Sequence, residues 1–219
     1  MRARFTIDEV RAKAIHIVDR DGLGSLSMRS LAAALGTGPM TLYNYVRDRD
    51  DLEGLVAEAV MADVDLPPRS ADWRADVKSI ATAIWEAMRR HPNAVPLVLT
   101  RRTASDAGYP PAERLIEALD RRQLDERDLL AAFRGVLSLV MGAAQVELAG
   151  PLPGIDREQA NATVADRIGR LAGSHYPRMA ALAQTSQKST MAADFERALD
   201  MLLAGIQARI PADGSELGG

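Results

Sequence analysis

Apolar residues recur every three or four positions along almost the whole chain, a spacing that predicts amphipathic helices. In the first part of the chain it predicts helices over four ranges, 7–21, 28–35, 39–46 and 49–65. Further along it predicts helices over 71–91, 111–123, 125–150, 155–172, 175–184 and 191–210. No segment shows the alternating β-branched pattern of a strand, so we expect an all-α protein.

Several of these helices have sequence signals at their ends. Gly22 follows the first helix and Gly36 the second, and glycine at that position favours helix termination. Ser27 and Asp48 stand where N-caps are expected, because their side-chain oxygens accept hydrogen bonds from free backbone N–H groups. The double proline 67–68 ends the fourth helix and is the best linker candidate.

These breaks predict two domains. We expect a small N-terminal domain over 1–48, a connecting helix over 49–65 and a larger helical domain over 66–210. Residues 211–219, PADGSELGG, have the composition of a disordered tail.

Charge is distributed unevenly. The net charge is -3, yet residues 1–50 hold eight Lys or Arg and six Asp or Glu, a balance of +2, which leaves -5 for the remainder. A mildly basic unit on an acidic body fits an anionic partner. The chain has no cysteine, which removes disulfides and thiolate sites, and we expect neither a metal nor a cofactor. Without a basic-apolar leader or an uninterrupted apolar run of about 18 residues, we expect a cytoplasmic protein with no membrane segment.

The stretch LAAALGTGPMTLYNYV, residues 31–46, combines turn-forming residues with two of the four tyrosines. Gly36 tolerates the positive φ that a tight turn between helices requires, and the small Ala32 lets the two backbones approach. Leu42 and Val46 supply the apolar side chains with which the next helix packs against this one. This pattern is typical of a helix-turn-helix, whose second helix enters the DNA major groove by its N-terminal end. The alternative is a purely structural turn in which the tyrosines only pack.

Side chains expected at the surface of this segment suit DNA contact. Thr41 offers a hydroxyl, Asn44 an amide that can make two hydrogen bonds to a base, and Tyr43 a phenol that can reach a phosphate. Thr37 and the free N–H groups at the helix start can hold a phosphate oxygen. The flanking cations are Arg29 and Arg49.

The segment SMRSLAAALGTGPMTLYNYVRDRDDL, residues 27–52, resembles the DNA-binding signature of the TetR family of bacterial transcriptional repressors. It shares the family's LAAxLG, its LYxYV, and the trailing K/R-x-K/R-x-DL that opens the fourth helix. The resemblance covers residues 7–60, and the rest of the chain matches in helical character and length. It implies that Arg29 contacts a base or a phosphate and that Arg49 binds a phosphate.

The same resemblance implies roles for the second helix of the motif. Thr41 and Tyr43 sit where the family commonly touches DNA, Tyr43 mainly at phosphate. Asn44 and Tyr45 fall where side chains vary with operator sequence, so they would tune specificity. Met40 and the proline before it stand where some members carry polar base-contacting residues. Since neither can donate a hydrogen bond, we expect sparse direct readout, with Met40 against a thymine methyl.

In the TetR family the larger domain binds a small-molecule effector and supplies a homodimer interface, usually a four-helix bundle. The apolar stripes of 126–149 and 191–210 are wider than one neighbouring helix needs, which suits burial against a partner chain. The residues assigned to the interface are Val136, Val140, Phe195, Leu199, Leu202, Leu203 and Ile206. The alternative is an ordinary monomeric core.

An effector pocket would lie between helices after Pro68. The apolar candidates for its wall are Trp85, Met88, Phe133, Leu137 and Met141. The polar candidates are His91, Tyr109, Gln145, His175 and Tyr176. Gln145 falls on a predicted buried stripe, where its amide must find a partner. The alternative for each residue is packing or simple surface exposure.

Taken together, the resemblance implies a homodimeric repressor that binds a palindromic DNA operator and is released when a small-molecule effector favours the other conformation. One alternative is a DNA-binding protein that is ligand-independent or controlled by a protein partner. The other is an all-α enzyme, although the three histidines are far apart in sequence and no phosphate loop or nucleophile elbow is present.

Overall fold

In the computed structural model, residues 5–101, 106–148, 163, 166–170 and 175–209 are described. Within them the secondary structure is helical throughout, without a strand. The helices are α1 (Ile7–Asp21), α2 (Met28–Ala34), α3 (Pro39–Leu42), α4 (Arg49–Ala62), α5 (Trp73–Arg90), α6 (Val95–Thr100), α7 (Tyr109–Asp120), α8 (Glu126–Leu148), α10 (Pro177–Ser186) and α11 (Met191–Ala208). Short 3₁₀ turns are η1 (Leu23–Ser25), η2 (Pro92–Ala94) and η3 (Asp106–Gly108). The expected all-α class is confirmed.

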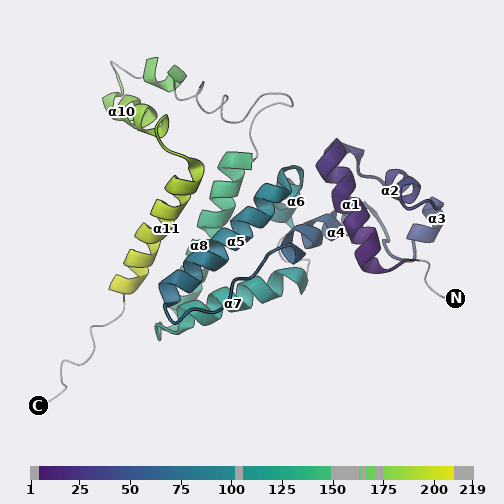
Figure 1. The fold of residues 1–219 in the computed structure, drawn as a ribbon, viewed down its shortest axis with the longest axis horizontal. Coiled ribbons are helices and arrows are strands. Elements are labelled where there is room, and N and C mark those ends of the chain that lie inside the picture. The colour runs from purple at the N-terminus through teal and green to yellow at the C-terminus, as the bar shows by residue number, and fades with distance from the viewer. Residues whose placement is uncertain (1–4, 102–105, 149–162, 164–165, 171–174, 210–219) are drawn as a thin grey trace, which may run out of the picture.

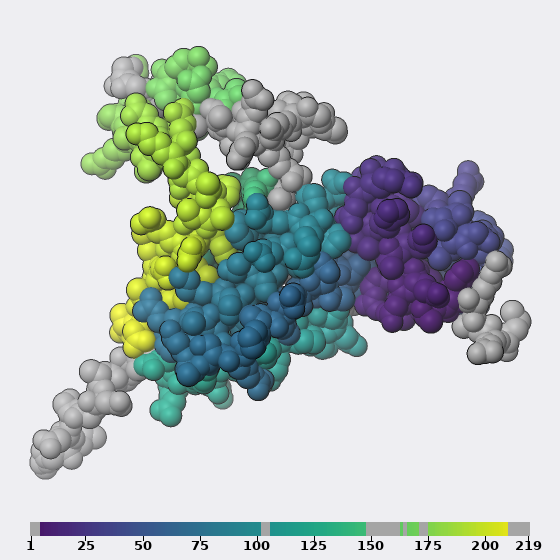
Figure 2. Space-filling view, in the orientation of Figure 1, coloured from purple at the N-terminus to yellow at the C-terminus, as the bar shows by residue number. Residues whose placement is uncertain are grey.

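The described residues form two parts joined by α4 (Figure 1). We call α1–α3, residues 5–48, the head, and the described residues from 66 onward the body. In the body α5 packs on α7 and α8, and α11 packs along α8. Figure 2 shows the head as a lobe at one end of the molecule, far from α11.

Helix α1 forms where the sequence predicts it. Thr6 caps its first turn: the Thr6 hydroxyl accepts from the Glu9 N–H at 3.2 Å while the Glu9 carboxylate accepts from the Thr6 N–H at 2.7 Å. Gly22 ends the helix with a φ of +81°, which favours glycine. The apolar stripe of α1 is buried against α4.

Helix α4 is buried on two sides. Its N-cap is Asp48, as predicted, whose carboxylate accepts from the Asp51 N–H at 2.9 Å. Leu52, Val56 and Val60 are almost fully buried, and the helix packs against α1 of the head and α6 of the body. The head and the body therefore share one apolar core, and α4 supplies its centre.

The largest local differences from the sequence prediction are at α3 and α6. α3 ends at Leu42 rather than at residue 46 because the Asn44 side chain donates to the Thr41 carbonyl at 3.1 Å and residues 43–45 turn. α6 was not predicted, since its six residues contain Pro96, but that proline lies in the first turn, where a helix needs no N–H. The predicted turn at 151–154 and the tail at 211–219 lie outside the described residues. Of the predicted helix 155–172, only 163 and 166–170 are described, and these are helical.

By length and composition alone, the segment Glu126–Glu147 of α8 would be able to cross a membrane, although the sequence analysis expected every apolar run to be interrupted too early. In the structure this helix packs against α5, α7 and α11. Only 28% of its 18-residue apolar window is buried, so much of α8 remains uncovered in the single chain.

A polar clasp fixes the chain after the double proline to the body. Asp76 of α5 is only 3% exposed and forms an ion pair with Arg121. The Asp76 carboxylate also accepts from the Ser70 N–H at 2.6 Å, and Arg121 donates to the Ser70 carbonyl at 2.7 Å. The clasp therefore ties the linker to α5 and to the end of α7.

We predict that Asp76→Ala lowers the free energy of unfolding by about 2 kcal/mol, because it leaves the Ser70 N–H and the partly exposed Arg121 without their acceptor. Urea denaturation followed by circular dichroism measures this loss. The control Asp120→Ala removes an exposed carboxylate at the end of α7 and should change stability by less than about 0.5 kcal/mol. Equal losses in the two variants would show that the clasp is not structural.

Candidate functional site

The turn between α2 and α3 has the backbone geometry of a helix-turn-helix. Ser27 caps α2, its hydroxyl accepting from the Ser30 N–H at 3.0 Å. After α2 the Thr37 N–H donates to the Ala32 carbonyl at 2.9 Å, and the Gly36 N–H donates to the Ala33 carbonyl at 3.1 Å. Gly36 has a φ of +63°, so these bonds make a Schellman turn. The turn aims the start of α3 outward.

The start of α3 is exposed while its end is anchored. Leu42 and Val46 are fully buried in the head. Met40 is 79% exposed and Tyr43 is 52% exposed, and Asn44 is also exposed. Thr41 is half-buried between them. A thioether, a phenol and an amide therefore protrude from one short segment, beside the half-buried Thr41.

The cations of the head and of the start of α4 differ in how they are paired. Arg47 binds Asp51 through two hydrogen bonds of 2.7 and 3.0 Å, and the side-chain bond from Arg47 lowers the pKa of the Asp51 carboxyl. Arg49 donates to Glu53 at 2.6 Å but remains 66% exposed. Arg29 is exposed on α2, and no carboxylate among the described residues lies within ion-pair distance of it. Arg29 is therefore an exposed cation that is available to a phosphate.

A residue of the body forms ion pairs with two carboxylates of α4 that lie close to Arg49. Arg101, at the end of α6, pairs with Asp50 at 2.7 Å and with the second oxygen of Glu53 at 2.9 Å. The hydrogen bond that Arg101 donates to the Asp50 carboxylate raises the pKa of Arg101 above its ordinary value. Glu53 thus links the body to the first turn of α4, a contact that the sequence analysis did not identify.

Tyr45 contacts the segment that precedes α1. Its hydroxyl accepts from the Phe5 N–H at 2.8 Å, and its ring meets the Phe5 ring edge-on at 6.3 Å. Tyr45 is half-buried and holds the chain that enters α1 against the head. The structure therefore favours an anchoring role for Tyr45 over the predicted tuning of specificity.

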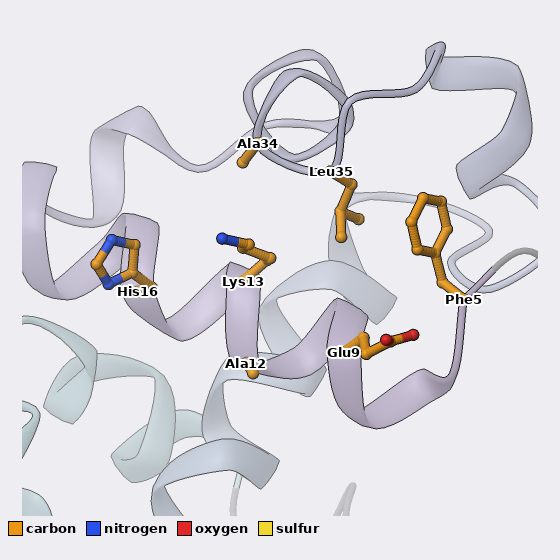
Figure 3. A pocket seen from close by; sticks show the side chains of 7 residues that line it. All are labelled: Phe5, Glu9, Ala12, Lys13, His16, Ala34 and Leu35. Carbon is orange, nitrogen blue, oxygen red and sulfur yellow. The ribbon is translucent and has the colours of Figure 1, made fainter.

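A groove of about 540 Å³ lies on the flank of the head, between α1 and the end of α2 (Figure 3). Phe5 and Leu35 line one end and Lys13 and His16 the other. None of the residues predicted to bind DNA or an effector lines it. It is also far along the chain from the effector pocket expected after Pro68.

The apolar residues predicted for the effector pocket lie in or beside the body core. Trp85, Met88 and Met141 are buried, and Phe133 and Leu137 are half-buried. The Trp85 ring stacks on Phe195 of α11 with a centroid distance of 4.6 Å. These side chains meet where α5, α8 and α11 come together.

The polar pocket candidates are not brought together. Tyr109 and Tyr176 are each 62% exposed, and Gln145 and His175 are exposed as well. The prediction that Gln145 is buried is wrong, because its face of α8 points away from the packed helices. His91 lies at the joint between head and body, where its Nδ1 is 2.8 Å from an oxygen of Asp19.

Other polar groups lie at the predicted pocket. The Glu147 carboxylate forms an ion pair with Arg89, with 3.1 Å between the nitrogen and the oxygen. The Arg89 guanidinium lies over the Trp85 ring, 4.9 Å from its centroid. Within the described part of the chain, the buried Trp85 Nε1 and one buried oxygen of Glu147 have no hydrogen-bond partner. Glu147 continues the buried stripe of Val136, Val140 and Ala144 at helical spacing. A carboxylate on an otherwise apolar stripe is the sequence pattern that indicates a polar group inside the body.

The predicted dimer residues mostly pack within the chain. Six of them are 7% exposed or less, namely Val136, Val140, Phe195, Leu199, Leu203 and Ile206. In the single chain these side chains pack where α8 meets α11, so the structure favours an intrachain role for them over the predicted contact with a second chain. Leu202 is half-buried, and its methyl groups lie over Gly135 of α8.

The chain matches a family model described as the Tetracyclin repressor-like, C-terminal domain, over residues 66–210. The transcriptional repressor DrrR1 of Streptomyces coeruleorubidus is 30% identical over 216 residues, which cover 94% of this chain and 78% of the relative. A transcriptional regulator from Saccharopolyspora erythraea is 33% identical over 144 residues, which cover 65% of this chain and 61% of that protein.

Solved structures agree with these matches. The crystal structure of the Streptomyces coelicolor protein ActR in complex with actinorhodin superposes with a TM-score of 0.82. The two sequences are 26% identical, and the match covers 97% of this chain and all of ActR. The likeness therefore extends over both the head and the body.

We predict that Arg29→Ala weakens binding to any DNA duplex and reduces the slope of log affinity against log salt by about one, because it removes one phosphate contact. Fluorescence anisotropy over a salt series measures both quantities. Arg178→Ala, which removes an equal charge from an exposed position of α10, is the control and should leave the slope unchanged. An unchanged slope in Arg29→Ala would remove Arg29 from the DNA contacts.

Proposed function

This chain belongs to the TetR family of transcriptional regulators, and we propose that it works as a homodimeric repressor that leaves a palindromic operator when a small molecule binds its body. Site-specific DNA binding is the activity of the regulators it matches. The observation that carries the proposal is the Schellman turn at Gly36, which projects the start of α3 from a fully packed head.

We assign DNA contacts to the exposed rim of the head. Met40 and Thr41 face the base edges, Met40 against a thymine methyl, and Asn44 makes hydrogen bonds at the groove edge. Tyr43 and Arg29 bind phosphates on either side. Arg49 binds a further phosphate through the guanidinium N–H groups that do not bond to Glu53. Thr37 binds the phosphate nearest the turn.

The dimer interface is assigned to the uncovered faces of α8 and α11. On α8 the exposed face includes Leu130, which is 47% exposed, and Gly142. On α11 it includes Met201, which is 68% exposed, and the exposed Ala204 and Ala208. Small residues let two backbones approach closely, and two such helices from each chain make an isologous bundle. The low burial of the apolar window of α8 supports the same assignment.

The effector site is assigned to the junction of α5, α8 and α11. Burying a polar group without a partner costs free energy. The orphaned Trp85 Nε1 and Glu147 oxygen therefore favour a conformation in which a bound molecule supplies an acceptor and a donor. ActR was crystallised with actinorhodin, which supports small-molecule control in this chain as well.

Two alternatives are less well supported. An enzyme would need a constellation of catalytic groups, and the orphaned groups of the body do not include a nucleophile with its base. We therefore propose that the chain has no catalytic activity. We also propose that it acts in the cytoplasm, because the proteins it matches are transcriptional regulators. Control by a protein partner alone would not explain why the buried polar groups of Trp85 and Glu147 lack hydrogen-bond partners.

The direct test is selection of bound duplexes from a random DNA pool by the full chain. We expect enrichment of a palindrome whose half-sites lie about one helical turn apart. The bound complex is then screened for release by a library of small molecules. Absence of an enriched palindrome would overturn the operator part of the proposal, and failure of every molecule in a broad library to cause release would overturn the effector part.

We predict that Met201→Glu converts the dimer to a monomer, because it places two negative charges face to face across the two-fold axis, and that operator affinity falls about a hundredfold. Sedimentation velocity measures the oligomeric state. Ile7→Glu, at a 43% exposed position on α1, is the control and should remain dimeric. A dimeric Met201→Glu would show that the interface lies elsewhere.

A further inference from the structure

Two polar side chains from one short segment of the body grip the end of α1. The Asn93 amide donates to the main-chain carbonyls of Val18 and Asp19, at 3.1 and 3.2 Å. Two residues earlier, His91 Nδ1 lies 2.8 Å from the Asp19 carboxylate. We call His91, Asn93 and their partner Asp19 the joint clamp. It connects head and body directly, without passing through α4.

The joint clamp also holds the end of α4. The other ring nitrogen of His91 lies 3.4 Å from the Asp63 carboxylate, directly after α4. Arg90 donates to the same carboxylate and to the Asp63 carbonyl, each at 2.5 Å. The C-terminal ends of α1 and α4 are therefore fixed to one four-residue segment, 90–93.

The contacts of the joint clamp restrict rotation more than a surface ion pair does. Asn93 bonds to main-chain atoms of α1, which cannot turn away as a flexible side chain can. The His91 side chain is only 17% exposed, so its contacts are partly shielded from water. Val18 and Ala94 are fully buried next to these bonds. The clamp therefore fixes the direction of the α1 axis relative to the body.

The far end of α1 carries the DNA-contacting segment. Phe5, just before α1, bonds to Tyr45, just after α3. From Asp19 back to Thr6 is about 20 Å of helix at 1.5 Å per residue. A rotation of about 10° at the clamp would thus move the α3 end of the head by about 3.5 Å, which is close to the rise of one base pair, about 3.4 Å.

We infer that His91 and Asn93 are positioning residues that set the angle at which each body carries its head, and through it the half-site spacing that the dimer accepts. This inference rests on the proposed function, since spacing has meaning only for a dimer on a palindrome. One added base pair moves a half-site by about 3.4 Å and turns it by about 35° around the DNA axis. A clamped head cannot follow that displacement, whereas a released head can.

The test uses the selected palindrome in versions with one base pair removed from, or one or two added to, the centre. The full chain and its Asn93→Ala variant are compared by anisotropy at one salt concentration. We expect the wild-type preference for the selected spacing over its neighbours to fall about tenfold in Asn93→Ala, because the loss of two hydrogen bonds frees the head. Affinity for a duplex with a single half-site should not change, since no DNA contact is lost.

A matched control separates positioning from general stability. Lys78→Ala removes two ion pairs of α5 with Glu196 and Asp200, far from the joint, and should keep the wild-type spacing preference. If Asn93→Ala gives no cooperative thermal unfolding, the same comparison on His91→Gln decides. A folded clamp variant with the wild-type spacing preference would overturn the inference, as would an equal loss in Lys78→Ala. Failure of the wild type to select any palindrome would instead contradict the proposed function.

Discussion

The whole architecture depends on α4 being buried from both sides. Leu52, Val56 and Val60 have almost no exposed surface because α1 covers one side of the helix and α6 the other. The head contains only three helices within residues 5–48 and is too small for an independent core of useful size. Because the head shares α4 with the body, the apolar contacts of α4 with the body also stabilise the head. The same sharing means that any movement of the body acts on the head.

Two sets of polar contacts refine this apolar connection, and a third polar feature lies within the body. Arg101 holds the first turn of α4 through Asp50 and Glu53. His91 and Asn93 hold the end of α1. Glu147 and Trp85 leave buried polar groups without partners at the centre of the body. Interior sites of this kind favour two discrete arrangements over continuous deformation, because packed cores resist small shifts. That is the physical requirement for a ligand to change DNA affinity.

Local signals in the sequence predicted much of the head. The capping residues Ser27 and Asp48 and the left-handed Gly36 act through neighbours within a few positions, so their roles follow from the sequence. The early end of α3 was missed because the Asn44 side chain competes with the backbone for the Thr41 carbonyl. Positions that depend on distant segments were also missed. Tyr45 binds Phe5, 40 residues away, and His91 binds Asp19, 72 residues away. The sequence of an apolar stripe likewise does not indicate whether the stripe packs against its own chain or against a partner. Leu199 and Leu203, predicted at the dimer interface, are buried within the single chain.

The central claim is that the start of α3 meets the bases of an operator. It is tested most directly by placing a benzophenone amino acid at the exposed position of Met40 and irradiating the complex with the selected palindrome. The structure predicts a covalent adduct at one base in each half-site, and no adduct from the same group at Met179 on α10. An intact, bound complex without any adduct from position 40 would contradict the account.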